Sequence, residues 1–159
     1  MNESINPHDD LQAILRHGDR ILGIDVGTKT FGLAIATLGL NIPTPLNVIV
    51  RQKYKTDILK MRDVIKQWDI KGLVIGLPLN MDGTSGVRVQ STKTIARNIA
   101  KDTGLPYCFQ DERLSTSEAT NRLIALNIRP SDRKNVIDSH AAVIILESYL
   151  GRIKNIDRE

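Results

Sequence analysis

The stretch ILGIDVGTKTFGLAIA, residues 21–36, decides the fold because a polar turn joins two apolar, β-prone runs. The order of strand, GTKT turn and strand is typical of a β-hairpin. One charged residue, Asp25, interrupts the first run two positions before Gly27. A buried carboxylate costs free energy unless its surroundings compensate for the charge. Three compensations are open for Asp25: hydrogen bonds to the turn, a bound phosphate or a metal ion.

The composition is that of one globular domain in a reducing compartment. The chain has 159 residues, of which 41% are hydrophobic and 25% charged. Its single cysteine, Cys108, excludes an intrachain disulfide and a Cys-based zinc site. No apolar run approaches the roughly 20 residues that span a bilayer, and the N-terminal segment lacks the order of a secretory signal. We therefore expect a cytoplasmic protein with no membrane partner.

The charge of the chain is compatible with a polyanionic partner. The net charge is +4 and the pI is near 9.3, with the basic residues spread along the sequence. Aromatic residues make up only 4% of the chain, which argues against a platform for stacked, single-stranded bases. Phosphate contacts are therefore the form of nucleic-acid binding that the composition favours.

Apolar periodicity divides the chain into strands and helices. The predicted strands are 20–26, 31–37, 46–50, 72–78 and 105–109. The predicted helices are 56–68, 87–101, 116–126 and 136–150. We expect Thr56 to cap the first helix, and Gly104 to end the second. Residues 20–152 are the predicted domain, between an N-terminal extension at 1–19, flexible or with one or two helical turns, and a polar tail at 153–159.

The order of these elements predicts an α/β fold. The first three strands follow one another closely and are expected to form an antiparallel meander. The later strands are separated by helices, and such crossovers imply parallel pairing with right-handed connections. We therefore expect a five-stranded mixed sheet, its first three strands antiparallel, with helices on both faces.

Three carboxylates stand at the ends of predicted elements: Asp25 near the end of the first strand, Glu112 just beyond the fifth, and Asp138 early in the final helix. In an open sheet, sites gather outside the carboxyl ends of parallel strands. Small residues at 141 and 142 lie on the same helix face as Asp138 and would let that helix approach the sheet. Clustered acids need a cation, and Mg²⁺ or Mn²⁺ prefers oxygen ligands. Two such ions can activate water and stabilise a leaving oxygen in phosphodiester cleavage.

Each acid also has an ordinary structural interpretation. Asp25 would serve as a cap of the GTKT turn. Glu112 would belong to a surface ion pair with Arg113. Asp138 would favour a helix N-terminus through the helix dipole. The remaining candidates, His140 and Cys108, are interpreted as packed core side chains.

Four segments in series resemble the YqgF family, also called RuvX. They are GIDVGTKTFGLA, VIGLPLNMDGTSG, DERLSTSEA and VIDSHAAVIILESYL, and the resemblance runs from Ile21 to Leu150. Members of this family are described as Holliday junction resolvases related to RuvC, with a ribonuclease-H-like fold. The first 19 residues lie outside every motif. Any one motif is weak, whereas four in order are highly specific.

The resemblance implies a metal-dependent nuclease, a hydrolase acting on phosphodiester bonds. By motif, Asp25, Glu112 and Asp138 correspond to the family's metal-binding and catalytic acids. The cofactor that the resemblance implies is Mg²⁺ or Mn²⁺, with two ions bound. The resemblance also links the chain to maturation of the 5′ end of pre-16S ribosomal RNA, the role we favour, with ribosomal particles as partners. Resolution of branched DNA is the alternative. A resolvase would need two sites and hence a homodimer, whereas an RNA-trimming enzyme can act as a monomer.

Basic residues near the motifs are candidates for nucleic-acid binding. Lys29 follows the first acid, Arg113 adjoins Glu112, and Arg88 follows a Gly-rich loop at a helix N-terminus. Arg133 and Lys134 belong to a predicted basic loop that leads to Asp138. The alternative for each is a solvated surface charge. Phosphate contacts would make binding steeply dependent on salt.

Two other classes of protein compete with this interpretation. The D-x-G-T motif before a hairpin also looks like the first phosphate loop of the actin and sugar-kinase ATPases, but those proteins bind ATP between two such subdomains and 159 residues supply one. A non-catalytic ribosome-assembly module with the same fold is the other, and the retained acids argue against it. A Rossmann site is disfavoured because no G-x-G-x-x-G follows the first strand.

Overall fold

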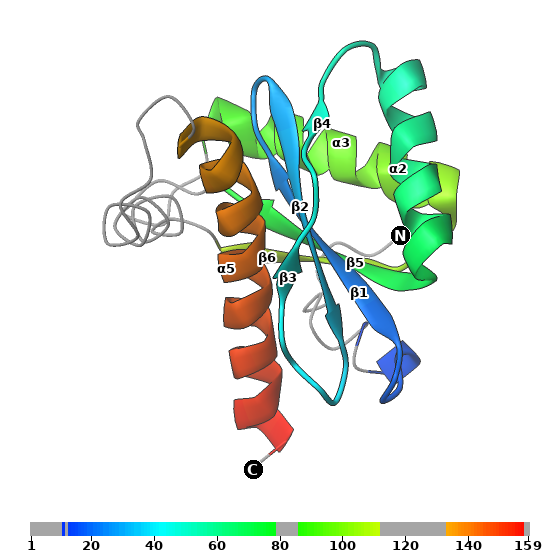
Figure 1. Ribbon diagram of the computed structural model, residues 1–159, viewed down its shortest axis with the longest axis vertical. Coiled ribbons are helices and arrows are strands. Elements are labelled where there is room, and N and C mark those ends of the chain that lie inside the picture. The colour runs from blue at the N-terminus through cyan, green and yellow to red at the C-terminus, as the bar shows by residue number, and fades with distance from the viewer. Residues whose placement is uncertain (1–10, 12, 79–85, 112–132, 158–159) are drawn as a thin grey trace.

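The computed structural model describes residues 11, 13–78, 86–111 and 133–157, and at 133–139 and 154–157 it describes the backbone alone. The fold centres on a six-stranded sheet in the order β3-β2-β1-β5-β6, with β4 also paired to β2 (Figure 1). β1 (Arg20–Val26) runs antiparallel to β2 (Thr30–Thr37) and parallel to β5 (Ile70–Leu77). β6 (Tyr107–Asp111) runs parallel to β5. The predicted mixed sheet, antiparallel at first and parallel later, is confirmed.

The predicted third strand at 46–50 is wrong in its extent. The structure has two short strands instead, β3 (Thr44–Pro45) and β4 (Ile49–Val50), which pair with the middle and the start of β2. Proline has no N–H group to donate to a strand ladder, so Pro43 and Pro45 limit the pairing here. The sheet therefore has six strands and not the expected five.

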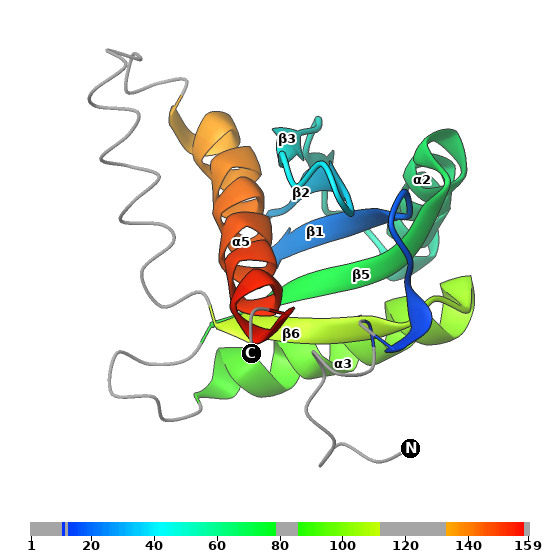
Figure 2. The same cartoon turned by 90° about the horizontal axis from the view of Figure 1, so that it is seen from below.

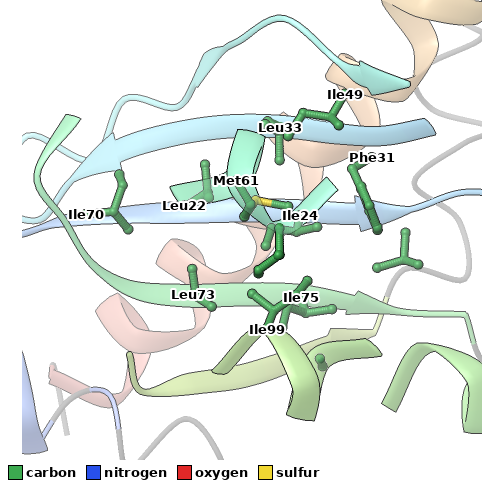
Figure 3. Packing of buried hydrophobic residues seen from close by; sticks show 13 residues of the cluster. Leu22, Ile24, Phe31, Leu33, Ile49, Met61, Ile70, Leu73, Ile75 and Ile99 are labelled. Carbon is green, nitrogen blue, oxygen red and sulfur yellow. The ribbon is translucent and has the colours of Figure 1, made fainter. Parts of the chain in front are cut away.

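Helices cover both faces of the sheet, as expected. Alternate residues of a strand face opposite sides. α2 (Tyr54–Trp68) and α3 (Val87–Thr103) cover the first side, which contains the side chains labelled in Figure 3. α5 (Arg133–Asp157) covers the second, and Figure 2 shows α5 and α2 on opposite sides of β1 and β5. The second core includes Ile21, Ala34, Val74, Cys108, Ala142 and Leu146.

The helix boundaries differ from the predicted ones at four ends, one each in α2 and α3 and both in α5. α2 begins at Tyr54, so Thr56 lies inside the helix and does not cap it. The buried carboxylate of Asp57 instead accepts the backbone N–H of Gln52 at 3.0 and 3.2 Å, which fixes the chain as it enters the helix. α3 ends at Thr103, two residues beyond the predicted end. Gly104 stops it, as predicted, because this residue adopts the left-handed conformation with φ of 72°.

α5 is longer than predicted at both ends. It begins at Arg133, so Arg133 and Lys134 belong to its first turn and not to a loop. Charged residues do not interrupt the helix here, since Arg and Lys are good helix formers. α5 also continues through Asp157, so the first part of the expected polar tail is helical. The predicted helix at 116–126 lies outside the described residues.

The described part of the N-terminal segment is attached to the sheet. Leu11 is fully buried in the core beneath α5, with Leu15 packed against the same cluster. The backbone N–H of Gly18 donates to the carbonyl of Leu38, and the N–H of Leu38 donates to the carbonyl of Asp19, both at 2.9 Å. None of the helices that the structure describes is long and apolar enough to cross a membrane.

Candidate functional site

The parallel strands bring Asp25 and Asp111 to one edge of the sheet. β1, β5 and β6 run in the same direction, so their carboxyl ends meet there. Ile24 pairs with Ile75 of β5, and Asp25 is the next residue of β1. Asp111 is the last residue of β6 and pairs with Leu77. This is the edge at which open α/β sheets bind their ligands.

Asp25 lies on the face of the sheet that α5 covers. Strand alternation places it with Gly23, and a Cβ atom added at Gly23 would meet Leu146 Cγ at 2.6 Å and the carbonyl oxygen of Ala142 at 3.1 Å. The helix therefore rests directly on the backbone of β1. The side chain of Asp25 is half-buried there.

The same contact fixes the position of the helix that carries Asp138. Ala141 and Ala142 are 1% and 0% exposed, so small residues do allow the close approach that we expected. Residue 138 lies one helical turn before Ala142, and Figure 1 shows the first turns of α5 (orange) at the same end of the molecule as the β1–β2 turn. The side chain of Asp138 and the whole of Glu112 lie outside the described residues, so the three-acid site remains a prediction.

Three cationic residues surround the turn that follows Asp25. Lys29 is exposed within the turn itself. Arg88, in the first turn of α3, donates from Nη2 to the carbonyl oxygen of Val26 at 3.3 Å. Arg51 donates from Nη1 to the carbonyl oxygen of Gly27. The two arginines thus hold consecutive carbonyl groups directly after the candidate acid.

Arg51 is a residue that the sequence reasoning missed. Its guanidinium lies 4.9 Å from the ring centroid of Phe31, and its backbone N–H donates to the carbonyl of Lys29 at 2.8 Å. It comes 26 residues after Asp25 in the chain, and only the pairing of β4 with the start of β2 brings it to the turn. No local motif marks it. Of the other predicted cations, Arg113 and the side chains of Arg133 and Lys134 lie outside the described residues.

Gly27 is required by the hairpin itself. Its N–H donates to the carbonyl of Thr30 at 2.9 Å, and a Cβ atom at this position would lie 2.9 Å from the same oxygen. Such a contact is too short for a side chain. The absence of a side chain at Gly27 therefore has a structural cause that does not depend on a bound phosphate.

Gln110 is a second residue that the sequence reasoning missed. Its side chain is 4% exposed, and within the described part of the chain its Oε1 atom has no hydrogen-bond partner. Only the strand assignment shows that this polar residue turns inwards.

The donor atoms at this edge fit a hard divalent ion. The Asp25 carboxylate and the Gln110 amide both offer oxygen, which Mg²⁺ and Mn²⁺ prefer. Among residues 11–111 and 140–153 with described side chains, no three Asp, Glu, His or Cys residues gather as a complete metal site. The described side chains alone therefore do not complete a metal site, and the ligand roles of Glu112 and Asp138 remain predictions.

Comparisons with known proteins agree with this architecture. A family model described as RuvX, Holliday junction resolvase, matches residues 19–152. A protein of Beijerinckia indica subsp. indica named "Putative pre-16S rRNA nuclease" is 40% identical over 153 residues, 96% of this chain and 93% of that protein. A Brucella anthropi protein of the same name is 43% identical over 150 residues, 94% of this chain and 91% of that protein. A Fowlpox virus resolvase in complex with Holliday junction DNA has the same fold, with a TM-score of 0.51 and 10% identity over 84% of this chain and 98% of that one.

Proposed function

The chain belongs to the RuvX family and has its ribonuclease-H-like fold, and on this premise we propose that it is a metal-dependent nuclease. Its proposed reaction is hydrolysis of phosphodiester bonds in structured nucleic acid. Its proposed cellular role is maturation of the 5′ end of pre-16S ribosomal RNA in the cytoplasm, on ribosomal particles. The curated relatives named for that RNA, at 40% and 43% identity, support this choice.

One observation carries the proposal: α5 rests on the backbone of β1 at Gly23. Asp25 follows that contact by two residues along the strand, and Asp138 precedes it by one turn along the helix. In the sequence Glu112 follows Asp111, the last residue of β6, and β6 ends at the same edge of the sheet as β1. An Asx cap at the turn would not require the close approach of α5 to β1.

The proposed role of the three acids is to bind two divalent ions, either Mg²⁺ or Mn²⁺. Bound divalent ions supply Lewis acidity, which lowers the pKa of water and stabilises charge on the leaving oxygen. The chain itself positions the phosphate backbone. Lys29, Arg51 and Arg88 surround the turn after Asp25, and a guanidinium that donates to one carbonyl keeps further N–H donors for phosphate. The remaining proposed phosphate contacts are Arg113, Arg133 and Lys134.

The test offers the purified chain two substrates, a precursor RNA extended beyond the 5′ end of 16S rRNA and a four-way DNA junction, with Mg²⁺, with Mn²⁺ and with chelator. The proposal expects cleavage of the RNA that stops with chelator. Cleavage of the junction alone, by a dimer in sedimentation, would favour the resolvase role that the family description suggests. Binding without cleavage of either substrate would favour the non-catalytic assembly module.

Three variants test the site itself: Asp25→Asn, Glu112→Gln and Asp138→Asn. Each is expected to abolish cleavage while the folded circular dichroism spectrum is retained. Asp69→Asn is a matched control, because Asp69 is 77% exposed, pairs with Lys71 and precedes β5 at the opposite end of the strand. Its left-handed φ of 51° also suits asparagine. Wild-type cleavage by all three site variants would refute the assignment.

A further inference from the structure

The buried amide of Gln110 has no explanation in the packing of the sheet. Its side chain is 4% exposed, and no donor in the described part of the chain reaches Oε1. A buried acceptor without a partner loses its hydrogen bonds to water and gains nothing in return. Such groups are rare in folded proteins, and a missing water, ion or ligand is a frequent cause.

The strand register places this amide beside the candidate acid. Gly76 of β5 pairs with Gln110, and Ile75 of β5 pairs with Ile24, the residue before Asp25. Asp25, Gly76 and Gln110 therefore form one row across three parallel strands at the carboxyl edge. The middle residue of the row has no side chain.

The amide and the acid also share a face of the sheet. Cys108, two residues before Gln110 in β6, lies in the core beneath α5, and Gly23, two residues before Asp25 in β1, contacts α5. Side chains two positions apart along a strand point to the same side. Gln110 and Asp25 thus lie on the same face of the sheet, on either side of a glycine.

We infer that Gln110 is a positioning residue of the proposed metal site, and that its Oε1 accepts a hydrogen bond from a water of the hydration shell of the divalent ion held by Asp25. The inference rests on the proposed function. Oε1 of the amide can only accept hydrogen bonds, so a neighbouring carboxylate cannot satisfy it. The waters of a hydrated cation are donors, and Mg²⁺ in particular keeps several of its waters when it binds to protein. The neutral amide orients such a water without adding a negative charge to the acids.

Manganese binding tests the inference without reference to cleavage. Isothermal titration of Mn²⁺ is compared between the wild type, Gln110→Met, Gln110→Glu and Asp25→Asn. Methionine keeps the shape of the side chain and removes the acceptor, so the Mn²⁺ dissociation constant should rise about 10- to 100-fold, the usual effect of losing an outer-shell partner. The melting temperature of the metal-free Gln110→Met chain should be unchanged or higher. Gln67→Met is the control, because Gln67 is exposed on α2, and it should bind Mn²⁺ as the wild type does.

The Gln110→Glu variant separates a metal role from a packing role. Glutamate keeps an oxygen at the same place, so Mn²⁺ should bind it as tightly as the wild type or more tightly. If the glutamine is merely structural and a buried water satisfies it, the order of Mn²⁺ affinity should be reversed. Methionine should then be tolerated, whereas the buried charge of glutamate should disrupt the site.

The outcomes distinguish the two proposals. Mn²⁺ binding that Asp25→Asn abolishes and Gln110→Met leaves unchanged would overturn the inference and retain the metal site. A wild-type chain that binds no Mn²⁺, or an Asp25→Asn chain that binds it normally, would overturn the metal site and the inference with it. Should Gln110→Met fail to fold, weaker Mn²⁺ binding by a folded Gln110→Glu chain would also overturn the inference.

Discussion

Substitution of Gly23 by alanine is expected to push α5 away from β1. The new Cβ atom would lie 2.6 Å from Leu146 Cγ and 3.1 Å from the carbonyl oxygen of Ala142. Carbon atoms normally approach to about 3.5–4.0 Å, so the first contact is short by roughly 1 Å. The second atom belongs to the helix backbone and cannot rotate away. Relief therefore requires the helix to move as well as the leucine side chain, which is itself fully buried.

The magnitude follows from the two opposing effects of the added methyl group. Overpacking a core costs about 1–3 kcal/mol of the free energy of unfolding. Replacement of glycine restricts the unfolded chain and returns about 0.4–1 kcal/mol. The net loss is thus roughly 1–2 kcal/mol, which in a domain of this size lowers the melting temperature by about 2–8 °C. Because Asp138 lies one turn from the contact, a helix shift near 1 Å should also reduce cleavage by about 100-fold at temperatures where the chain stays folded.

Thermal unfolding measures the predicted loss of stability, and cleavage rates measure the predicted loss of activity. Gly151→Ala on the same helix is the control, because its Cβ atom would meet nothing within 4 Å and alanine is the better helix former, so stability should not fall. Leu146→Ala alone should cost about 2–5 kcal/mol. In the Gly23→Ala background it should cost less, because it removes the clash. A Gly23→Ala chain with wild-type melting temperature and rate, or strict additivity in the double variant, would refute the reasoning.

Three further changes have defined outcomes. Leu11→Ala should lower the free energy of unfolding by about 2–5 kcal/mol in urea, because the side chain is fully buried; no change would mean that residue 11 does not contribute to the core. Burial raises the pKa of the Tyr149 hydroxyl, so the folded chain holds this proton more tightly than the unfolded chain does. The resulting stability is present below about pH 10 and is lost as the pH rises further. In urea titrations at alkaline pH, Tyr149→Phe should therefore lose less stability than the wild type, and equal losses would contradict this cause. Arg51→Gln should weaken RNA binding and reduce the salt slope of log K by roughly 0.7–0.9, measured by anisotropy across KCl concentrations, whereas an unchanged slope would remove Arg51 from the phosphate contacts.

The strands and the main helices could be predicted because their signals are local. The run around Asp25 is apolar and β-branched on both sides of a turn, and it forms β1 and β2 as expected. Gly104 ends α3 because left-handed backbone favours glycine whatever its tertiary surroundings. The third strand was predicted as one piece because the apolar run 46–50 gave no sign of where the backbone leaves the ladder.

The missed site residues depend on contacts between distant parts of the chain. Arg51 looks like any basic residue after a short strand, and it gains its role only when β4 pairs beside the turn. Gln110 becomes unusual only once the register assigns it to the buried face and its acceptor is left without a donor in the described structure. Asp25 could be predicted as a candidate because a charge inside an apolar strand is conspicuous in the sequence itself. The local pattern thus identifies a site residue when its burial is costly, and not when its partners are remote.

The packing of α5 on β1 also determines when, during synthesis, the core beneath this helix can be completed. Ile21 and Ala34, which belong to the apolar face beneath α5, are synthesised early. The helix that covers this face begins only at Arg133. A nascent chain must therefore keep that face uncovered, or shielded by a chaperone, until α5 has been made. The proposed ligand Asp138 arrives with the same helix. If the chain is the nuclease that we propose, a partly made copy is unable to cut the RNA of the ribosome that is still producing it.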